Sequence, residues 1–188
     1  MNMKTKLILT LIVVLSCIIL PATAQNGFTN KSEAKNEVRN GFREGKFIVY
    51  LDSSFNGIYD SNVAVYYALM IYEADKIYGI KRTYHKNGKL YAEAPYINGK
   101  VNGAFKIYYE SGTLQQEVSF VNGEKNGVNK EFYKNGQAHY QYSYTHDKVN
   151  GVVKEYYEDG KLKYEANYTD GKPNGVEKNY DENGNEIK

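Results

Sequence analysis

The chain has 188 residues, with 24 Lys+Arg, 22 Asp+Glu, 20 Tyr, 7 Phe and no Trp. This length suits one modest domain, and the nearly balanced, well-mixed charge argues against nucleic acid as a partner, because that needs a basic patch or stripe. The many tyrosines favour half-buried positions on a sheet that faces water on at least one side.

The N-terminus has the order of a secretory signal peptide. Two lysines precede an apolar run (7–20) that is shorter than the ~20 residues of a membrane span, and small residues ending at Ala24 follow it. This order predicts a signal peptide over residues 1–24, with cleavage between Ala24 and Gln25. Without those two lysines the remainder has 22 basic and 22 acidic residues, so its formal net charge is zero.

The only cysteine, Cys17, lies inside this predicted signal. "VLSC" could be a lipoprotein box, which would make Cys17 a lipidated N-terminus. Three apolar residues follow Cys17 where lipoproteins usually turn polar, so we favour ordinary cleavage. We therefore expect an exported protein, in the periplasm, the cell envelope or outside the cell, with a lipid anchor as the alternative. The mature chain would have neither a thiol nor a disulfide.

Residues 25–44 are polar and without period, which predicts a linker or an N-terminal cap. The repeat domain is then expected over 45–188. Its first unit, 45–78, begins like the later units but carries an insertion of about ten residues. The second half of that unit contains "VAVYYALMIY", the most apolar stretch after the signal, and we expect a buried strand there. A short buried helix is the alternative.

A period of 24 residues follows, and it recurs four times before a shorter last copy. The units are 79–102, 103–126, 127–150, 151–174 and the partial 175–188. Counted from the first Gly of each unit, position 4 is basic, positions 6 and 18 are aromatic, and position 15 is Glu or Gln. We predict that the glycines at positions 1 and 10 form turns: Gly79, Gly88, Gly103, Gly112, Gly127, Gly136, Gly151, Gly160 and Gly175.

The glycines also indicate how each unit folds. Twelve of the 17 follow Asn, and Asn-Gly is the strongest short signal for a tight β-hairpin turn. Each unit is therefore predicted to contain two strands that form one hairpin. A lone hairpin cannot bury its face, so its neighbours must stabilise it. We predict an all-β fold, an elongated antiparallel meander of stacked β-hairpins.

Two registers are open for these hairpins. A two-residue loop in the middle of the unit would place position 4 opposite position 15, as in Arg82 opposite Glu93. A three-residue loop with a left-handed Gly would place position 6 opposite position 12 and put positions 2, 6, 12, 16 and 18 on one face. A one-residue slip exchanges faces, so we expect only one register to hold. We favour the second, because apolar burial generally outweighs exposed ion pairs.

The repeat pattern resembles the variant MORN repeat of the YwqK family of bacterial antitoxins, over about 45–188. In unit 151–174 and the start of the next, the residues that carry the resemblance are Gly151, Lys154, Tyr156, Tyr157, Gly160, Leu162, Glu165, Tyr168, Gly171, Lys172, Asn174 and Gly175. The resemblance implies a hairpin-repeat fold and a role in binding a protein or a membrane. For an antitoxin, the bound protein would be a toxin.

No motif indicates catalysis. His85, His139 and His146 occupy different positions of their units, whereas a metal site needs ligands that converge at a defined spacing, and we expect all three at the surface. The acidic position 15 recurs with a basic position 4, which indicates pairing across the sheet. No phosphate-binding glycine motif is present. We expect no enzymatic activity, no cofactor and no bound metal.

The second aromatic position, Tyr109, Tyr133 and Tyr157, is the best candidate binding surface. If position 6 faces inward, these rings point outward in a row, and tyrosine rows are used in recognition. The alternative is that they pack on a second copy or bind nothing. We predict a non-enzymatic exported scaffold that binds an unidentified protein. The alternatives are a toxin-neutralising immunity protein, a membrane-surface protein that binds lipid headgroups through position 4, and, with least support, an extracellular hydrolase.

Overall fold

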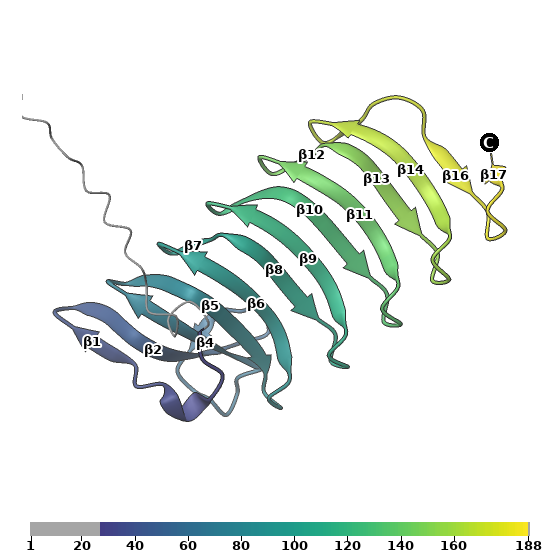
Figure 1. The fold of residues 1–188 in the computed structure, drawn as a ribbon. Helices are drawn as coiled ribbons and strands as arrows, with labels where there is room; N and C mark the ends of the chain where they lie inside the picture. The colour runs from purple at the N-terminus through teal and green to yellow at the C-terminus, as the bar shows by residue number, and fades with distance from the viewer. Residues whose placement is uncertain (1–26, 188) are drawn as a thin grey trace, which may run out of the picture.

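The computed structural model describes residues 27–187, so the predicted signal peptide, Cys17 and the cleavage site at Ala24 and Gln25 lie outside the described residues. Residues 27–187 form one open sheet of 17 strands, which runs along the molecule as a meander (Figure 1). All of its strand pairs are antiparallel. The predicted all-β architecture of stacked hairpins is confirmed.

Ten strands of six or more residues build the sheet: β2 (Phe42–Leu51), β4 (Tyr66–Glu73), β5 (Lys76–His85), β6 (Leu90–Ile97), β8 (Gly103–Tyr108), β9 (Leu114–Val121), β10 (Glu124–Phe132), β11 (Ala138–Thr145), β13 (Gly151–Tyr156) and β14 (Leu162–Thr169). The shorter elements are the 3₁₀ turn η1 (Lys31–Glu33), β1 (Glu37–Arg39), β3 (Gly57–Ile58), β7 (Lys100–Val101), β12 (Lys148–Val149), β15 (Lys172–Pro173), β16 (Lys178–Tyr180) and β17 (Glu186–Ile187).

The turns that join successive units have two residues with positive φ. Asn98 and Gly99 have φ of 52° and 78°, and the residues on either side of them, Ile97 and Lys100, lie opposite each other. This is the geometry that Asn-Gly favours, because both residues tolerate the left-handed region. His146 and Asp147 occupy the same kind of turn in a later unit, with φ of 48° and 63°, so the turn persists without its preferred residues.

The turn in the middle of each unit is the three-residue loop. In unit 79–102, the His85 N–H donates to the Lys89 carbonyl at 2.8 Å, and the Gly88 N–H donates to the His85 carbonyl at 2.9 Å. Gly88 has a φ of 88°. Tyr84 lies opposite Leu90, which confirms the favoured register at this end of the hairpin.

The other register is present as well, so the expectation that the two exclude each other is wrong. Arg82 lies opposite Glu93, and the pairing shifts between Thr83 and Tyr84. The shift is a β-bulge, in which one extra residue, Tyr91 at position 13, stands on one strand only. Units 103–126, 127–150 and 151–174 shift at the same place.

The bulge also corrects the expected face assignment. Position 2 pairs with position 17 and position 3 pairs with position 16, as Ala104 with Ser119 and Phe105 with Val118 show. Residues directly opposite each other share a face, and alternate residues of a strand share a face. Positions 3, 5, 14, 16 and 18 therefore form one face, here the aromatic face. Positions 2, 4, 6, 12, 15 and 17 form the other, here the ion-pair face.

Successive turns are also joined by backbone hydrogen bonds along one edge of the sheet. Position 21 donates its N–H to the carbonyl of position 23 in the preceding unit: Gly123 to Val101 at 2.8 Å and Gly171 to Val149 at 2.9 Å. Asp147 bonds to Lys125 in the same way at 3.0 Å. Each hairpin is thereby fixed to its neighbour beyond the strand pairing itself.

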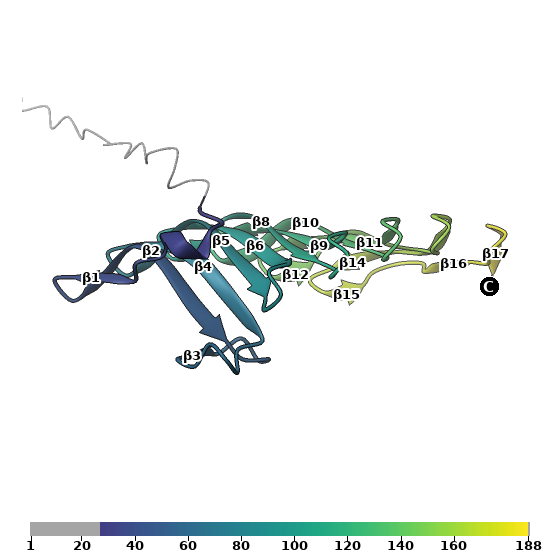
Figure 2. The same ribbon diagram turned by 90° about the horizontal axis from the view of Figure 1, so that it is seen from below.

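The best-buried part of the protein lies at its N-terminal end. Strand β4 is buried as predicted, with Leu69 and Ala68 at 0% exposure. Ala68 packs with Phe47 in one cluster and Leu69 packs with Phe28 in another. Phe28 lies just before η1, so the segment ahead of β1 covers one side of β4. In Figure 2, β2 and β4 bend away from the otherwise thin, elongated sheet.

Candidate binding face

The three tyrosines predicted as a binding row are tied to the next unit. The hydroxyls of Tyr109, Tyr133 and Tyr157 each donate a hydrogen bond of 2.7 Å to a backbone carbonyl at position 6 of the following unit. The acceptors are Phe132, Tyr156 and Tyr180. All three tyrosines are half-buried. They have a structural role at this edge of the sheet, and their part in binding stays a prediction.

A different group of tyrosines lies on the aromatic face. Tyr140, Tyr142 and Tyr144 alternate along β11 and therefore point to the same side of the sheet. Tyr164 and Tyr168 occupy matching positions on β14. A shallow depression of about 310 Å³ lies among them, lined by Glu131, Tyr140, Tyr142, Tyr144, Val149, Val153 and Tyr168.

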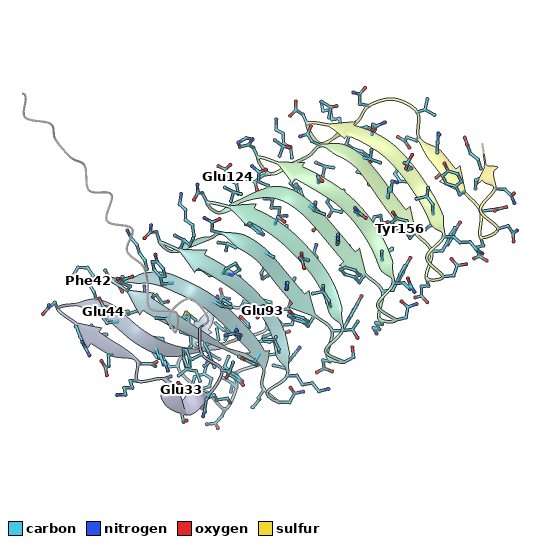
Figure 3. All side chains as sticks on the ribbon, in the orientation of Figure 1. Glu33, Phe42, Glu44, Glu93, Glu124 and Tyr156 are labelled. Carbon is cyan, nitrogen blue, oxygen red and sulfur yellow. The ribbon has the colours of Figure 1, made fainter. Side chains whose placement is uncertain are left out.

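No second layer of described residues covers these tyrosines. Figure 3 shows side chains that project from the sheet over its whole length, and Figure 2 shows a single layer from β8 onward. Tyr142, Tyr144 and Tyr168 are nevertheless only half-exposed, because neighbouring rings pack together. The Tyr142 and Tyr144 ring centroids, for example, lie 5.4 Å apart. The tyrosines therefore form a packed amphipathic surface, in which each ring is held by its neighbours.

Buried polar groups support this surface from the middle of the sheet. Asn129 is fully buried, and its Oδ1 accepts from Gln116 Nε2 at 3.2 Å. Glu131 Oε1 accepts from the Tyr142 hydroxyl at 3.0 Å and from Gln116 Nε2 at 3.4 Å. Burial, then contact with Tyr144 and Glu131, raises the pKa of Tyr142 above its ordinary value. Tyr142 is therefore a neutral hydrogen-bond donor at physiological pH.

A second polar group on the same side involves one of the histidines. Glu155 Oε1 lies 2.7 Å from Lys163 Nζ and 3.7 Å from His139 Nε2. The His139 ring centroid lies 4.2 Å from those of both Tyr133 and Tyr140. The hydrogen bond to Glu155 raises the pKa of Lys163. This cluster gives the aromatic face charged side chains next to its tyrosines.

The three histidines, which were expected at the surface, differ in exposure. His139 is half-buried against tyrosines, and His85 is half-buried between Tyr66 and Tyr91. His146 lies exposed in its turn. The three do not converge, and within residues 27–187 no three His, Cys, Asp or Glu side chains are grouped closely enough to hold a metal ion.

The ion-pair face carries the predicted cross-strand pairs. Arg82 lies 3.5 Å from Glu93, and the pairs formed by Lys106 with Glu117 and by Lys154 with Glu165 measure 4.0 Å and 3.1 Å. The two more exposed pairs, those of Lys106 and Lys154, each stabilise the fold by only about 0–1 kcal/mol. These pairs also mean that three of the five basic residues at position 4 already have a carboxylate partner, which leaves them less able to bind an external anion.

Three segments of the chain match the MORN repeat variant family: 77–98, 101–122 and 149–170. They fall on units 79–102, 103–126 and 151–174, so three of the repeat units are similar to this family. No curated protein matches the chain. The narrower resemblance to the YwqK family therefore stays a prediction. Over the described part of the chain, no helix is long and apolar enough to cross a membrane.

Sequence reasoning missed the tyrosines of β11, although the signal was present. "YQYSY" (140–144) alternates aromatic and polar residues, which marks one face of a strand. The sequence also shows that Asn129 and Glu131 are polar at positions 3 and 5, where the preceding unit has the apolar residues Phe105 and Ile107. The positions that recur in every unit define the fold, whereas these residues are among those that differ between units.

Proposed function

We propose that this protein is a non-enzymatic, exported scaffold that binds another protein along its aromatic face. The observation that supports this is the group of five tyrosines on β11 and β14, which no other described layer covers. Tyrosine is enriched at protein interfaces because its rigid, amphipathic ring loses little conformational entropy on binding. Repeats of the matched family are commonly interaction modules.

The chemistry of the face suits a protein partner. The tyrosine rings supply apolar area, their hydroxyls supply hydrogen bonds, and Glu131 and the Glu155–Lys163 pair place charged side chains beside them. The depression of about 310 Å³ between the rings would accept one side chain of a partner. Toxin neutralisation is a special case of this proposal, in which the partner is a toxin.

Lipid binding through position 4 has less support. Arg82, Lys106 and Lys154 already have carboxylate partners on the ion-pair face. A net charge of zero after removal of the signal also gives little long-range attraction to anionic lipid. The aromatic face is the more suitable surface.

Affinity capture with matched variants tests the proposal. The tagged chain from Gln25 onward is exposed to envelope and secreted fractions of its native cell, beside the variant Tyr144→Ser/Tyr168→Ser and the control Val128→Ser/Val152→Ser. The two valines are exposed on the opposite face. We expect one partner near equal stoichiometry with the wild type and the control, and at least about 10-fold less with the tyrosine variant.

Equal retention of the partner by all three proteins would show that the partner does not bind through the aromatic face. Retention of lipid alone, or of nothing, would refute the proposal. Co-sedimentation with anionic vesicles, run in parallel, would identify the membrane-surface alternative. Circular dichroism of each variant verifies that the sheet is intact before binding is compared.

A further inference from the structure

A second depression lies at the N-terminal end of the aromatic face. It has a volume of about 250 Å³ and is open on one side. Its walls come from β5, β6, β8, the end of β2 and the loop after β2. The large apolar lining residues are Leu51, Phe55, Tyr91, Tyr96 and Phe105, and the one basic lining residue is Lys81.

Lys81 combines partial burial in this depression with the absence of a counter-charge. It stands at position 3 and pairs across the strands with Ala94, whereas no later unit has a basic residue at position 3: the residues there are Phe105, Asn129, Val153 and Glu177. Among residues 27–187 it has no ion pair and no hydrogen-bond partner for its ammonium. Glu93 also borders the depression, but its carboxylate pairs with Arg82 at 3.5 Å. Burial lowers the pKa of Lys81, which is the effect of partial desolvation of a cation.

Phe55 forms one wall of the depression in a costly backbone conformation. Its φ is 63°, in the left-handed region that bulky residues rarely adopt, and such conformations cluster at functional sites. Asp52 holds the loop in place, since its Oδ1 accepts from the backbone N–H groups of Ser54 and Asn56 at 2.8 and 2.9 Å. The Phe55 ring stacks on Tyr66, with centroids 4.6 Å apart.

We propose that this depression binds the C-terminal carboxylate and the apolar last side chain of a partner polypeptide. The carboxylate would accept a charge-assisted hydrogen bond from Lys81, while the side chain would lie among Phe55, Tyr91 and Phe105. The volume is below the roughly 300–1,000 Å³ of sites for drug-sized ligands, so it suits a single residue.

A polypeptide is favoured because the depression is continuous with the aromatic face. Tyr96 lines it and is the first residue of the position-18 column, which continues through Phe120, Tyr144 and Tyr168. A chain anchored by its last residue can therefore continue across the tyrosines of β11. This inference rests on the proposed function in taking the partner to be a protein.

The test uses acetyl-Gly-Gly-Gly-Phe with a free carboxylate and the same peptide as its C-terminal amide. Binding to the chain from Gln25 onward is followed by NMR titration. We expect the acid to bind and the amide to bind at least about 10-fold more weakly, because the amide cannot form the hydrogen bond between two charged groups. This comparison needs no variant. Equal binding of the two peptides, or no binding, would overturn the proposal.

Variants then locate the site. Lys81→Met keeps the aliphatic stem and should reduce binding of the acid by at least about 10-fold. Lys106→Met, on the ion-pair face, should leave it unchanged. Equal affinities of the two variants would also overturn the proposal.

A third arm separates the two sources of a carboxylate. If 3-phenylpropionate binds as tightly as the peptide acid, the ligand is a small carboxylic acid and the polypeptide assignment is wrong. The tests of the two proposals are distinguishable. Peptide binding without a captured partner would support the carboxylate site and refute the scaffold function. A captured partner without peptide binding would support the scaffold function and refute the carboxylate site.

Discussion

The tyrosine ties between units give the sharpest test of how the sheet is held together. Tyr133→Phe removes one hydroxyl and leaves the ring in place, so the substitution abolishes only the 2.7 Å hydrogen bond to the Tyr156 carbonyl. The bonds from Tyr109 and Tyr157 are removed in the same way. If these bonds help to hold the units together, each substitution must lower the free energy of unfolding.

The magnitude follows from the geometry of the bond. A hydrogen bond within a protein contributes about 0.5–1.5 kcal/mol net, and a buried acceptor left without its partner costs about 1–3 kcal/mol. The tyrosines are half-buried, so water can partly replace the missing donor, and we expect about 1 kcal/mol per site. The three sites lie in different units, so their effects should add to about 3 kcal/mol. For a domain of this size, that lowers the melting temperature by roughly 6–12 °C.

Urea denaturation and thermal melting of the single and triple variants measure this effect. The matched control is Tyr59→Phe, since Tyr59 is fully exposed and its hydroxyl makes no hydrogen bond among the described residues. The control should unfold like the wild type. If the triple variant unfolds at the same midpoint as the control, the hydroxyl bonds do not stabilise the stack and the reasoning fails.

Three further predictions concern turns, core and pH. Ala74 has a φ of 46° at the first position of a two-residue turn, so Ala74→Asn should stabilise the protein by about 1 kcal/mol, measured by thermal melting, and a lower melting temperature would contradict this. Leu69 is fully buried whereas Leu162 is half-buried, so Leu69→Ala should cost about 2–5 kcal/mol in urea unfolding and Leu162→Ala clearly less. Equal costs would show that the core extends evenly along the repeats. Burial, then the hydrogen bond to Glu93, raises the pKa of Tyr108 from 10.0 to about 12. The folded state therefore binds the Tyr108 hydroxyl proton more tightly than the unfolded state does. The contribution of Tyr108 to the free energy of unfolding is complete below pH 10 and is lost as the pH rises toward about 12. Tyr108→Phe should flatten the stability curve over that range, and an unchanged slope would exclude this residue as the cause.

The hairpins were predictable because their signals are local. Asn98-Gly99 specifies a two-residue turn through the conformations that these two residues tolerate, and the 24-residue period shows that the same choice recurs. The buried strand β4 was predictable from its continuous apolar composition. Each of these features depends on residues that are close together in the sequence.

The bulge was not predictable because it has no residue signature. The extra residues at position 13 are Tyr91, Gln115, His139 and Lys163, which share neither size nor polarity. The bulge is selected by the two turns that flank each strand, whose registers differ by one residue and must be reconciled within the strand. A period in the sequence shows which positions are equivalent, but not which face each one occupies.

The binding features were hidden for a related reason. The depression beside Lys81 needs Phe55, which belongs to an insertion that occurs in only one unit. The hydroxyl of Tyr133 bonds to a backbone carbonyl, and a carbonyl is present at every position of every sequence. The repeat therefore shows the recurring tyrosine donors but not what they bond to, and it does not show the depression, because one of its walls occurs only once.

That universality of the acceptors has a consequence for the length of the molecule. Along the edge of the two-residue turns, and from unit 103–126 onward along the other edge as well, successive units are joined through a main-chain oxygen, which no substitution removes. If unit 127–150 were deleted, Asn126 would directly precede Gly151 and restore Asn-Gly, and the Tyr109 hydroxyl would meet the Tyr156 carbonyl in place of that of Phe132. The length of the sheet can therefore change in steps of one 24-residue unit. Recombination can add or remove a unit without requiring a compensating substitution in the units that remain.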